Sequence, residues 1–113
     1  MNPPQVDRLV ILTASGMQMD ALLTHLSKNK FRFTVINTTS GLLNEPEGCL
    51  LIGLSNKRLQ LLLEIVREDC RPFRQFVSTQ GYMQGEIASP SMVEVELGGA
   101  RLYVMNVERY EQI

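Results

Sequence analysis

Residues 31–43 read Phe-Arg-Phe-Thr-Val-Ile-Asn-Thr-Thr-Ser-Gly-Leu-Leu, in which alternating side chains run into a polar segment with a glycine. The alternation predicts a strand over residues 31–37 with Arg32 and Thr34 on one face, because successive strand side chains point to opposite faces. Arg32 offers a planar fork of donors suited to phosphate, and Thr34 adds a hydroxyl. The backbone around Gly41 is free to approach an anion. The stretch therefore predicts a phosphate-bearing ligand.

The segments around this stretch read as strands and helices. The apolar run at residues 9–12 predicts a strand buried on both faces, and apolar residues at helical spacing predict a helix over residues 16–28. A second apolar run, at residues 49–54, predicts another strand. The helix that follows it ends before Pro72, since proline cannot continue a helix.

The rest of the chain predicts a short strand, a long loop and a hairpin. Residues 73–78 read as the strand, and residues 79–91, which contain glycine and proline, read as the loop. Strict alternation over residues 93–97, the pair Gly98-Gly99 and the returning segment 101–107 predict the hairpin.

This order of elements is β-α-β-β-α-β with an extra C-terminal hairpin, and it predicts an α+β, ferredoxin-like fold. Two helices would cover one face of an antiparallel sheet and leave apolar residues on the other face uncovered. A small domain with such a bare face usually oligomerises. The length of 113 residues fits a single domain, residues 1–113.

Composition argues against several classes of function. A formal net charge of −1 leaves no basic footprint for nucleic acid. The apolar runs are too short to span a membrane, and the first residues lack the features of a signal peptide, so we expect a cytoplasmic protein. Cys49, Cys70 and His25 form no zinc or catalytic pattern. We therefore expect no metal, no cofactor and no enzymatic activity.

Several motifs occur in an order and spacing that resembles the PII-like cyclic-di-AMP receptor family over about residues 8–112. The motifs are Phe31-Arg32-x-Thr34, Thr38-Thr39-x-Gly41-x-Leu43, Val93-Glu94-Val95-Glu96-x-Gly98-Gly99-Ala100 and Gln112. The resemblance implies a signalling protein that is a homotrimer of ferredoxin-like subunits and that binds its ligand between subunits.

The same resemblance implies a set of ligand-binding residues. Arg32 would lie near a phosphate of the ligand, with Thr34 as its hydroxyl partner. The loop positions would meet an adenine, Gly53 would lie close to the ligand, and the tail glutamine would reach the site. The complete set is Arg32, Thr34, Gly41, Leu42, Leu43, Gly53 and Gln112.

Three functions remain open at this point. The first is a receptor that binds a nucleotide second messenger, cyclic di-AMP, and relays binding through loop ordering to an unidentified protein partner. Lys30, Leu42 and Glu47 differ from the family's pattern and favour a second reading, a PII-like sensor of another nucleotide or anion such as ATP or ADP. The third is a ligand-free trimeric adaptor protein.

Overall fold

The structure is a computed structural model that describes residues 5–39, 46–78 and 92–113. The predicted loop over residues 79–91 lies outside the described residues. The elements, in chain order, are β1 (Arg8–Ser15), α1 (Gly16–Lys28), β2 (Phe33–Thr39), β3 (Pro46–Leu54), α2 (Asn56–Asp69), β4 (Phe73–Ser78), β5 (Met92–Leu97) and β6 (Ala100–Asn106).

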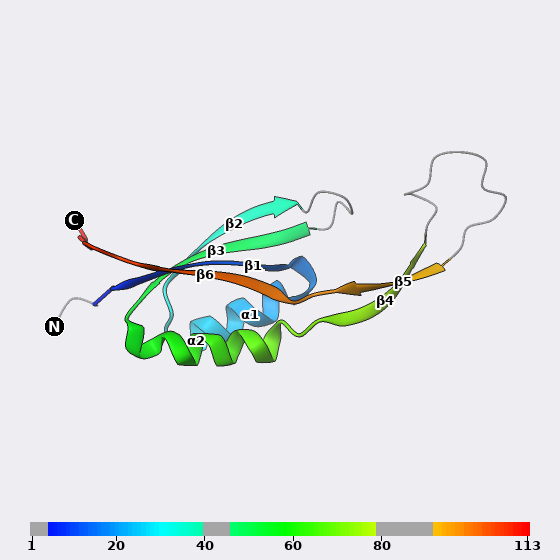
Figure 1. Cartoon of the computed structure of the whole chain (residues 1–113), viewed down its shortest axis with the longest axis horizontal. Helices are drawn as coiled ribbons and strands as arrows, with labels where there is room; N and C mark the ends of the chain where they lie inside the picture. The colour runs from blue at the N-terminus through cyan, green and yellow to red at the C-terminus, as the bar shows by residue number, and fades with distance from the viewer. Residues whose placement is uncertain (1–4, 40–45, 79–91) are drawn as a thin grey trace.

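Four strands form the main sheet in the order β2-β3-β1-β6, with antiparallel neighbours throughout. Figure 1 shows α1 and α2 together on one side of this sheet. Strands β4 and β5 form a separate antiparallel pair, here termed the arm, which extends away from the main sheet (Figure 1). The protein is thus α+β with two helices and antiparallel sheets, and it is compatible with the predicted ferredoxin-like fold.

The predicted hairpin between residues 93–97 and 101–107 was wrong. β5 pairs with β4 in the arm, and β6 pairs with β1 in the main sheet. Gly98 and Gly99 both have positive φ, 81° and 80°, but they lead the chain from the arm back to the main sheet. β6 therefore takes the place of the fourth strand in the β-α-β-β-α-β order, and the extra pair of strands precedes it.

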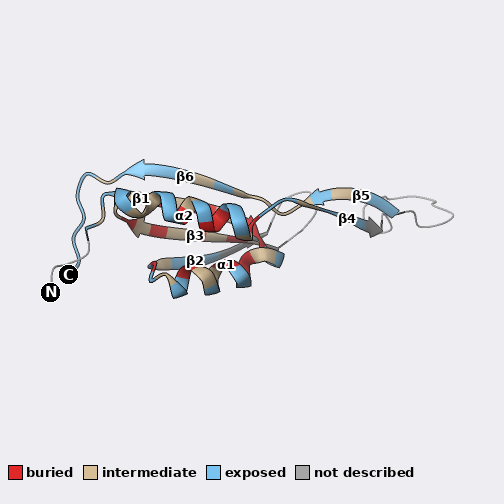
Figure 2. Cartoon of the chain, turned by 90° about the horizontal axis from the view of Figure 1, so that it is seen from below, coloured by how far each residue is buried: buried red, intermediate tan, exposed pale blue. Residues whose placement is uncertain are grey.

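The core lies between the two helices and the main sheet (Figure 2). Side chains of α1, α2 and the helix-facing side of the sheet fill it, and burial stabilises the fold by about 1.5–3 kcal/mol for each large apolar side chain. The largest fully buried members are Val10, Leu12, Leu22, Leu26, Leu50, Ile52 and Leu62. Because Val10 and Leu12 alternate with half-buried Leu9 and Ile11, only one face of β1 belongs to this core.

The other face of the main sheet, here termed the open face, carries apolar side chains that neither α1 nor α2 covers. Ile11 lies opposite Leu51 on one side and Tyr103 on the other, so the three side chains share this face. Tyr103 is 55% exposed and Ile36, further along the same face, is 44% exposed. The expectation of a bare apolar sheet face is therefore confirmed. Neither described helix is long and apolar enough to cross a membrane.

Candidate ligand site

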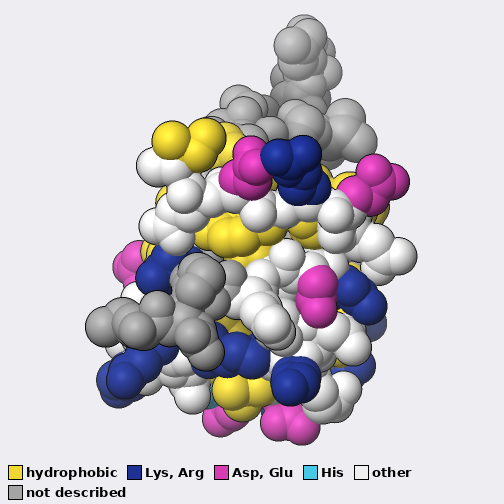
Figure 3. Space-filling view, turned by 90° about the vertical axis from the view of Figure 1, so that its left-hand side faces the viewer, with side chains coloured by type: hydrophobic (Ala, Val, Ile, Leu, Met, Phe, Trp, Pro, Cys, Tyr) yellow, Lys and Arg dark blue, Asp and Glu magenta, His cyan; other side chains and the backbone are white. Residues whose placement is uncertain are grey.

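The ends of four strands meet at one end of the main sheet, here termed the tail end. The amide of Asp7 donates to the carbonyl of Leu54 at 3.1 Å, and the amide of Val107 donates to the carbonyl of Asp7 at 3.0 Å. These bonds join the starts of β1 and of the C-terminal tail to the end of β3. β2 starts here too, since Phe33 pairs with Ile52. Several Lys and Arg side chains are exposed at this end (Figure 3).

Three of the predicted site residues come together at the tail end. Thr34 lies opposite Leu51, and one step beyond the pair Phe33–Ile52 the same register puts Arg32 opposite Gly53. Residues directly opposite one another in an antiparallel pair share a face. Arg32, Thr34 and Gly53 therefore lie on the open face, and both polar side chains are exposed to solvent. An exposed guanidinium beside a hydroxyl is suited to binding a phosphate.

The absence of a side chain at Gly53 lets the N-terminal segment pass close to the backbone of β3. A Cβ added at this position would lie 3.2 Å from Cγ1 of Val6, which is tighter than most contacts of this kind. The N-terminal segment thus passes close over Gly53. A larger residue would displace Val6 or fill the space beside Arg32.

Arg32 follows a tight turn that ends α1. The amide of Lys30 donates to the carbonyl of Ser27 at 3.0 Å, and the amide of Phe31 donates to the carbonyl of Leu26 at 3.0 Å. This pair of bonds is the Schellman motif, in which one residue adopts a left-handed conformation. That residue is Lys30, with a φ of 60°. Because Phe31 turns inward and is only 5% exposed, the strand begins two residues later than predicted.

Gln112 lies in the exposed tail that leaves the tail end after β6. The hydroxyl of Tyr110 donates to Oε1 of Gln112 at 3.5 Å. The described hydrogen bond of Gln112 is thus made with Tyr110 in the same tail, and not with Arg32. The tail starts at the same end of the sheet as Arg32 and Gly53, but the structure does not bring the glutamine side chain onto them.

The remaining predicted residues, Gly41, Leu42 and Leu43, lie outside the described residues. The chain enters and leaves that segment at Thr39 and Pro46, which pair at the far end of β2 and β3. The seven residues of β2 separate this loop end of the sheet from the tail end by about 23 Å, at about 3.3 Å for each strand residue. Arg32, Thr34 and Gly53 therefore lie at the opposite end of the sheet from Thr39 and Pro46.

A hollow at the loop end was not predicted from the sequence. It is lined by Thr13, Ser15 and Glu47 of the main sheet together with the Gly98-Gly99 connection and Arg101. The pairing of Thr13 with Arg101 brings these elements together. Sequence patterns give no signal for it, because the predicted hairpin assigned the strand of Arg101 to another partner. The hollow joins acidic and basic side chains at the base of the arm.

Cys70 and His25 both lie beside Asp69, the last residue of α2. Burial, and then the Asp69 carboxylate, raise the pKa of the Cys70 thiol to about 11, so this thiol is neutral near pH 7 and a poor nucleophile. Both cysteines are free. Nδ1 of His25 lies 2.9 Å from Oδ2 of Asp69, and this pair links α1 to α2. Across residues 5–39, 46–78 and 92–113, no cluster of three His, Cys, Asp or Glu side chains could hold a metal ion.

An exposed arginine and a hydroxyl lie beside a strand glycine at one end of the sheet of this α+β protein, and such groups are suited to binding an anionic ligand. A family model described as "Cyclic-di-AMP receptor" matches residues 8–113, and the chain belongs to this family. The family supports a role in binding and signalling, with cyclic di-AMP as the ligand.

The chain is also similar to a solved structure described as that of a functionally unknown protein from Pediococcus pentosaceus ATCC 25745. The two share 22% sequence identity with a TM-score of 0.74, over 96% of this chain and 98% of the other. At this level of identity the similarity concerns the fold alone. It extends over the main sheet, the helices and the arm, since nearly the whole of both chains is covered.

Proposed function

We propose that this protein is a single-domain, PII-like receptor of the cytoplasm that binds cyclic di-AMP at the subunit interfaces of a homotrimer. The position of Arg32 carries this proposal. Its side chain is exposed on the open face, beside Thr34 and Gly53, in a member of the cyclic-di-AMP receptor family. A guanidinium can bind a phosphate through two parallel hydrogen bonds, and Thr34 adds a third donor.

The length of β2 supports binding between subunits. Arg32 lies about 23 Å from Thr39, after which the chain continues to Gly41, Leu42 and Leu43. A ligand that contacts both sets of residues would then be held by two copies of the chain. The bare apolar open face supports subunit contact. Gln112 of the exposed tail would close the site over the bound ligand.

Binding would act on the partner by ordering a loop. Ligand contact through Gly41, Leu42 and Leu43 would favour one conformation of the segment between β2 and β3, and the protein partner would distinguish that conformation from the others. The leucine at position 42 would cover an adenine face without the stacking that an aromatic ring gives, which is worth about 1–3 kcal/mol per base. Affinity would then depend more strongly on the phosphate contacts of Arg32.

Calorimetric titration of the folded protein with cyclic di-AMP, ATP and AMP tests the proposal, after light scattering has established the oligomeric state. We expect a trimer that binds cyclic di-AMP and loses this binding in Arg32→Ala. The matched control is Arg74→Ala, because Arg74 lies on the arm, where its Nη1 is 3.7 Å from Oε1 of Glu94. A folded trimer that takes up none of the three nucleotides would refute a nucleotide receptor, and a monomer that binds would refute the interface site.

A second candidate function, a sensor of ATP or ADP, is favoured by Lys30. This lysine is exposed two residues before Arg32 and adds a second positive charge at the tail end, which suits a more highly charged mononucleotide. Tighter binding of ATP than of cyclic di-AMP in the same titration would support it.

The ligand-free adaptor is favoured by Phe76 and Met92 on the arm, which are 63% and 61% exposed. It predicts that Arg32→Ala leaves partner binding unchanged.

A further inference from the structure

We infer that Arg58, in the first turn of α2, is a positioning residue that holds Arg32 ready for the phosphate of the ligand. The inference rests on the proposed function and extends it to a residue on another element. Nη2 of Arg58 donates to the carbonyl of Asn29, and Nη1 donates to the carbonyl of Lys30 at 3.4 Å. Both acceptors belong to the turn that leads directly into Arg32.

The turn needs an external donor because of how α1 ends. The Schellman bonds satisfy the carbonyls of Leu26 and Ser27. The carbonyls of Asn29 and Lys30 follow the last residue of the helix, and these are the acceptors that Arg58 binds. Lys30 also holds a left-handed conformation that costs a residue other than glycine about 1–2 kcal/mol. A cation at this end further complements the helix dipole. Arg58 meets these needs with two donors from one rigid group.

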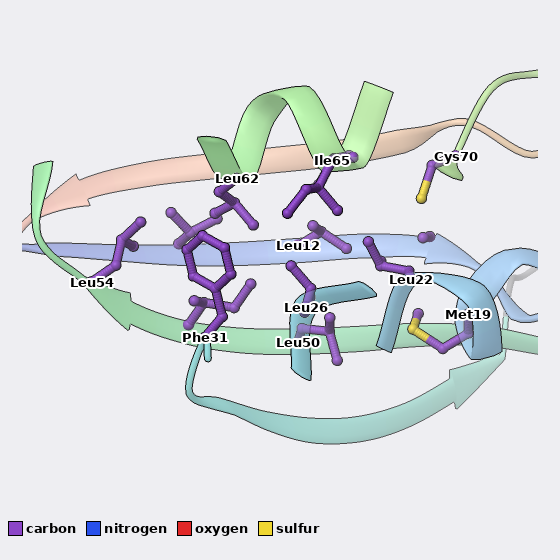
Figure 4. Close-up of a cluster of buried hydrophobic side chains, with 14 residues drawn as sticks. Leu12, Met19, Leu22, Leu26, Phe31, Leu50, Leu54, Leu62, Ile65 and Cys70 are labelled. Carbon is purple, nitrogen blue, oxygen red and sulfur yellow. The ribbon is translucent and has the colours of Figure 1, made fainter. Parts of the chain in front are cut away.

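A third contact ties Arg58 to the core. Its Cζ lies 4.0 Å from the centre of the Phe31 ring, a distance typical of a cation–π interaction. Figure 4 shows the Phe31 ring pointing into the core beside Leu54 and Leu62. Phe31 is thus fixed from within by the core and from outside by Arg58. Since Arg32 is the next residue, its backbone is fixed by the same contacts.

Lysine cannot replace arginine in this role. An ammonium group carries the same charge, but it is a compact point charge and lacks the planar fork that reaches two carbonyls and stacks on a ring. Arg58→Lys therefore separates the effect of geometry from the effect of charge. The matched control is Arg67→Lys, which makes the same substitution at an exposed position in the last turn of the same helix.

The first measurement is the affinity for cyclic di-AMP by calorimetry. If Arg58→Lys leaves the turn in the competent conformation one tenth of the time, the dissociation constant rises about tenfold. We expect this rise in Arg58→Lys and no change in Arg67→Lys. An unchanged affinity in Arg58→Lys would overturn the inference. Thermal unfolding of both variants shows whether they are folded. If Arg58→Lys does not fold, Phe31→Leu takes its place in the titration, because it removes the ring on which Arg58 stacks while keeping the core filled.

A double-mutant cycle separates positioning from a general structural role. The second background is Arg32→Lys, which keeps the positive charge but lacks the planar fork. If Arg58 acts through Arg32, the effect of Arg58→Lys on affinity is smaller in this background than in the wild type. An equal loss of affinity in both backgrounds would show that Arg58 acts independently of Arg32.

A wild-type protein that binds no cyclic di-AMP would refute the proposed function instead. The inference would then be decided by NMR relaxation of the Arg32 backbone amide in the ligand-free protein. Arg58→Lys must increase the mobility of this amide, and unchanged mobility would overturn the inference.

Discussion

The amide of Phe31 donates to the carbonyl of Leu26 at 3.0 Å, and this bond forces the intervening Lys30 into a left-handed conformation. Lysine pays a steric penalty for that conformation, whereas glycine does not. The chain therefore reaches Arg32, just before the start of β2, through a turn under local strain. The strain is stored at the edge of the candidate site, between the core residue Phe31 and the helix.

Lys30→Gly should stabilise the protein by about 0.5–1 kcal/mol, because glycine adopts the left-handed conformation freely at this position. The control is Lys28→Gly, in the last residue of α1, which should destabilise the protein by up to about 1 kcal/mol. Urea unfolding of both variants measures the free energies. Destabilisation by Lys30→Gly would show that the lysine side chain contributes more than its backbone conformation costs.

Much of the fold could be predicted because the signals are local. The apolar spacing over residues 16–28 gives α1 the bounds that the structure has, and the alternation that includes Thr34 gives the correct face of β2. Strand pairing is not local. The alternating residues of β5 and the glycines after them fit a hairpin with β6, but they do not specify which strand lies opposite.

The glycine pair shows why that prediction was wrong. A Cβ added at Gly98 would lie 2.9 Å from the carbonyl oxygen of Arg71 and 2.8 Å from Oε1 of Gln18. Gly98 is therefore needed where the connection from α2 to the arm passes close by, not to close a two-residue turn. The role inferred for Arg58 escaped prediction for a similar reason, since nothing near it in the sequence indicates the carbonyls that it binds on another element.

Gly98→Ala should destabilise the protein by about 2–3 kcal/mol, because a left-handed residue with a side chain is strained and the new methyl group meets the carbonyl oxygen of Arg71. Gly99→Ala is the matched control. Its φ is also positive, but a Cβ there would lie no closer than 3.6 Å to Cγ of Pro72, so only the strain of about 1–2 kcal/mol applies. Thermal unfolding compares the two variants, and hydrogen exchange of the arm shows where the loss occurs. Equal losses would exclude crowding at Gly98.

Gly53→Ala should weaken cyclic-di-AMP binding with little change in stability. The methyl group would reduce the freedom of the unfolded chain, which favours folding by about 0.5–1 kcal/mol, but it would crowd Val6 at 3.2 Å, and the two effects oppose each other. On the open face, the same methyl group would stand beside Arg32 where the ligand approaches. Calorimetry and urea unfolding separate the two readouts. Full affinity in a folded Gly53→Ala protein would place the ligand away from β3.

The raised pKa of Cys70 should make the protein less stable in alkali. The folded thiol has a pKa of about 11 against a reference value of 9.0, so between these values the unfolded chain binds fewer protons than the folded one. The contribution of this thiol to the free energy of unfolding is constant below pH 9. It is lost as the pH rises from 9 to 11, with a slope of up to about 1.4 kcal/mol per pH unit.

Replacing the thiol isolates this effect from the other groups that titrate in alkali. Cys70→Ala should lower stability at pH 7, because a buried sulfur is lost. Between pH 9 and pH 11, however, the free energy of unfolding of this variant should fall less steeply than that of the wild type. Cys49→Ala, which leaves Cys70 in place, should keep the wild-type slope. Urea unfolding at a series of pH values gives the three curves. Parallel curves for the wild type and Cys70→Ala would mean that the Cys70 thiol ionises no less readily in the folded protein than in the unfolded chain.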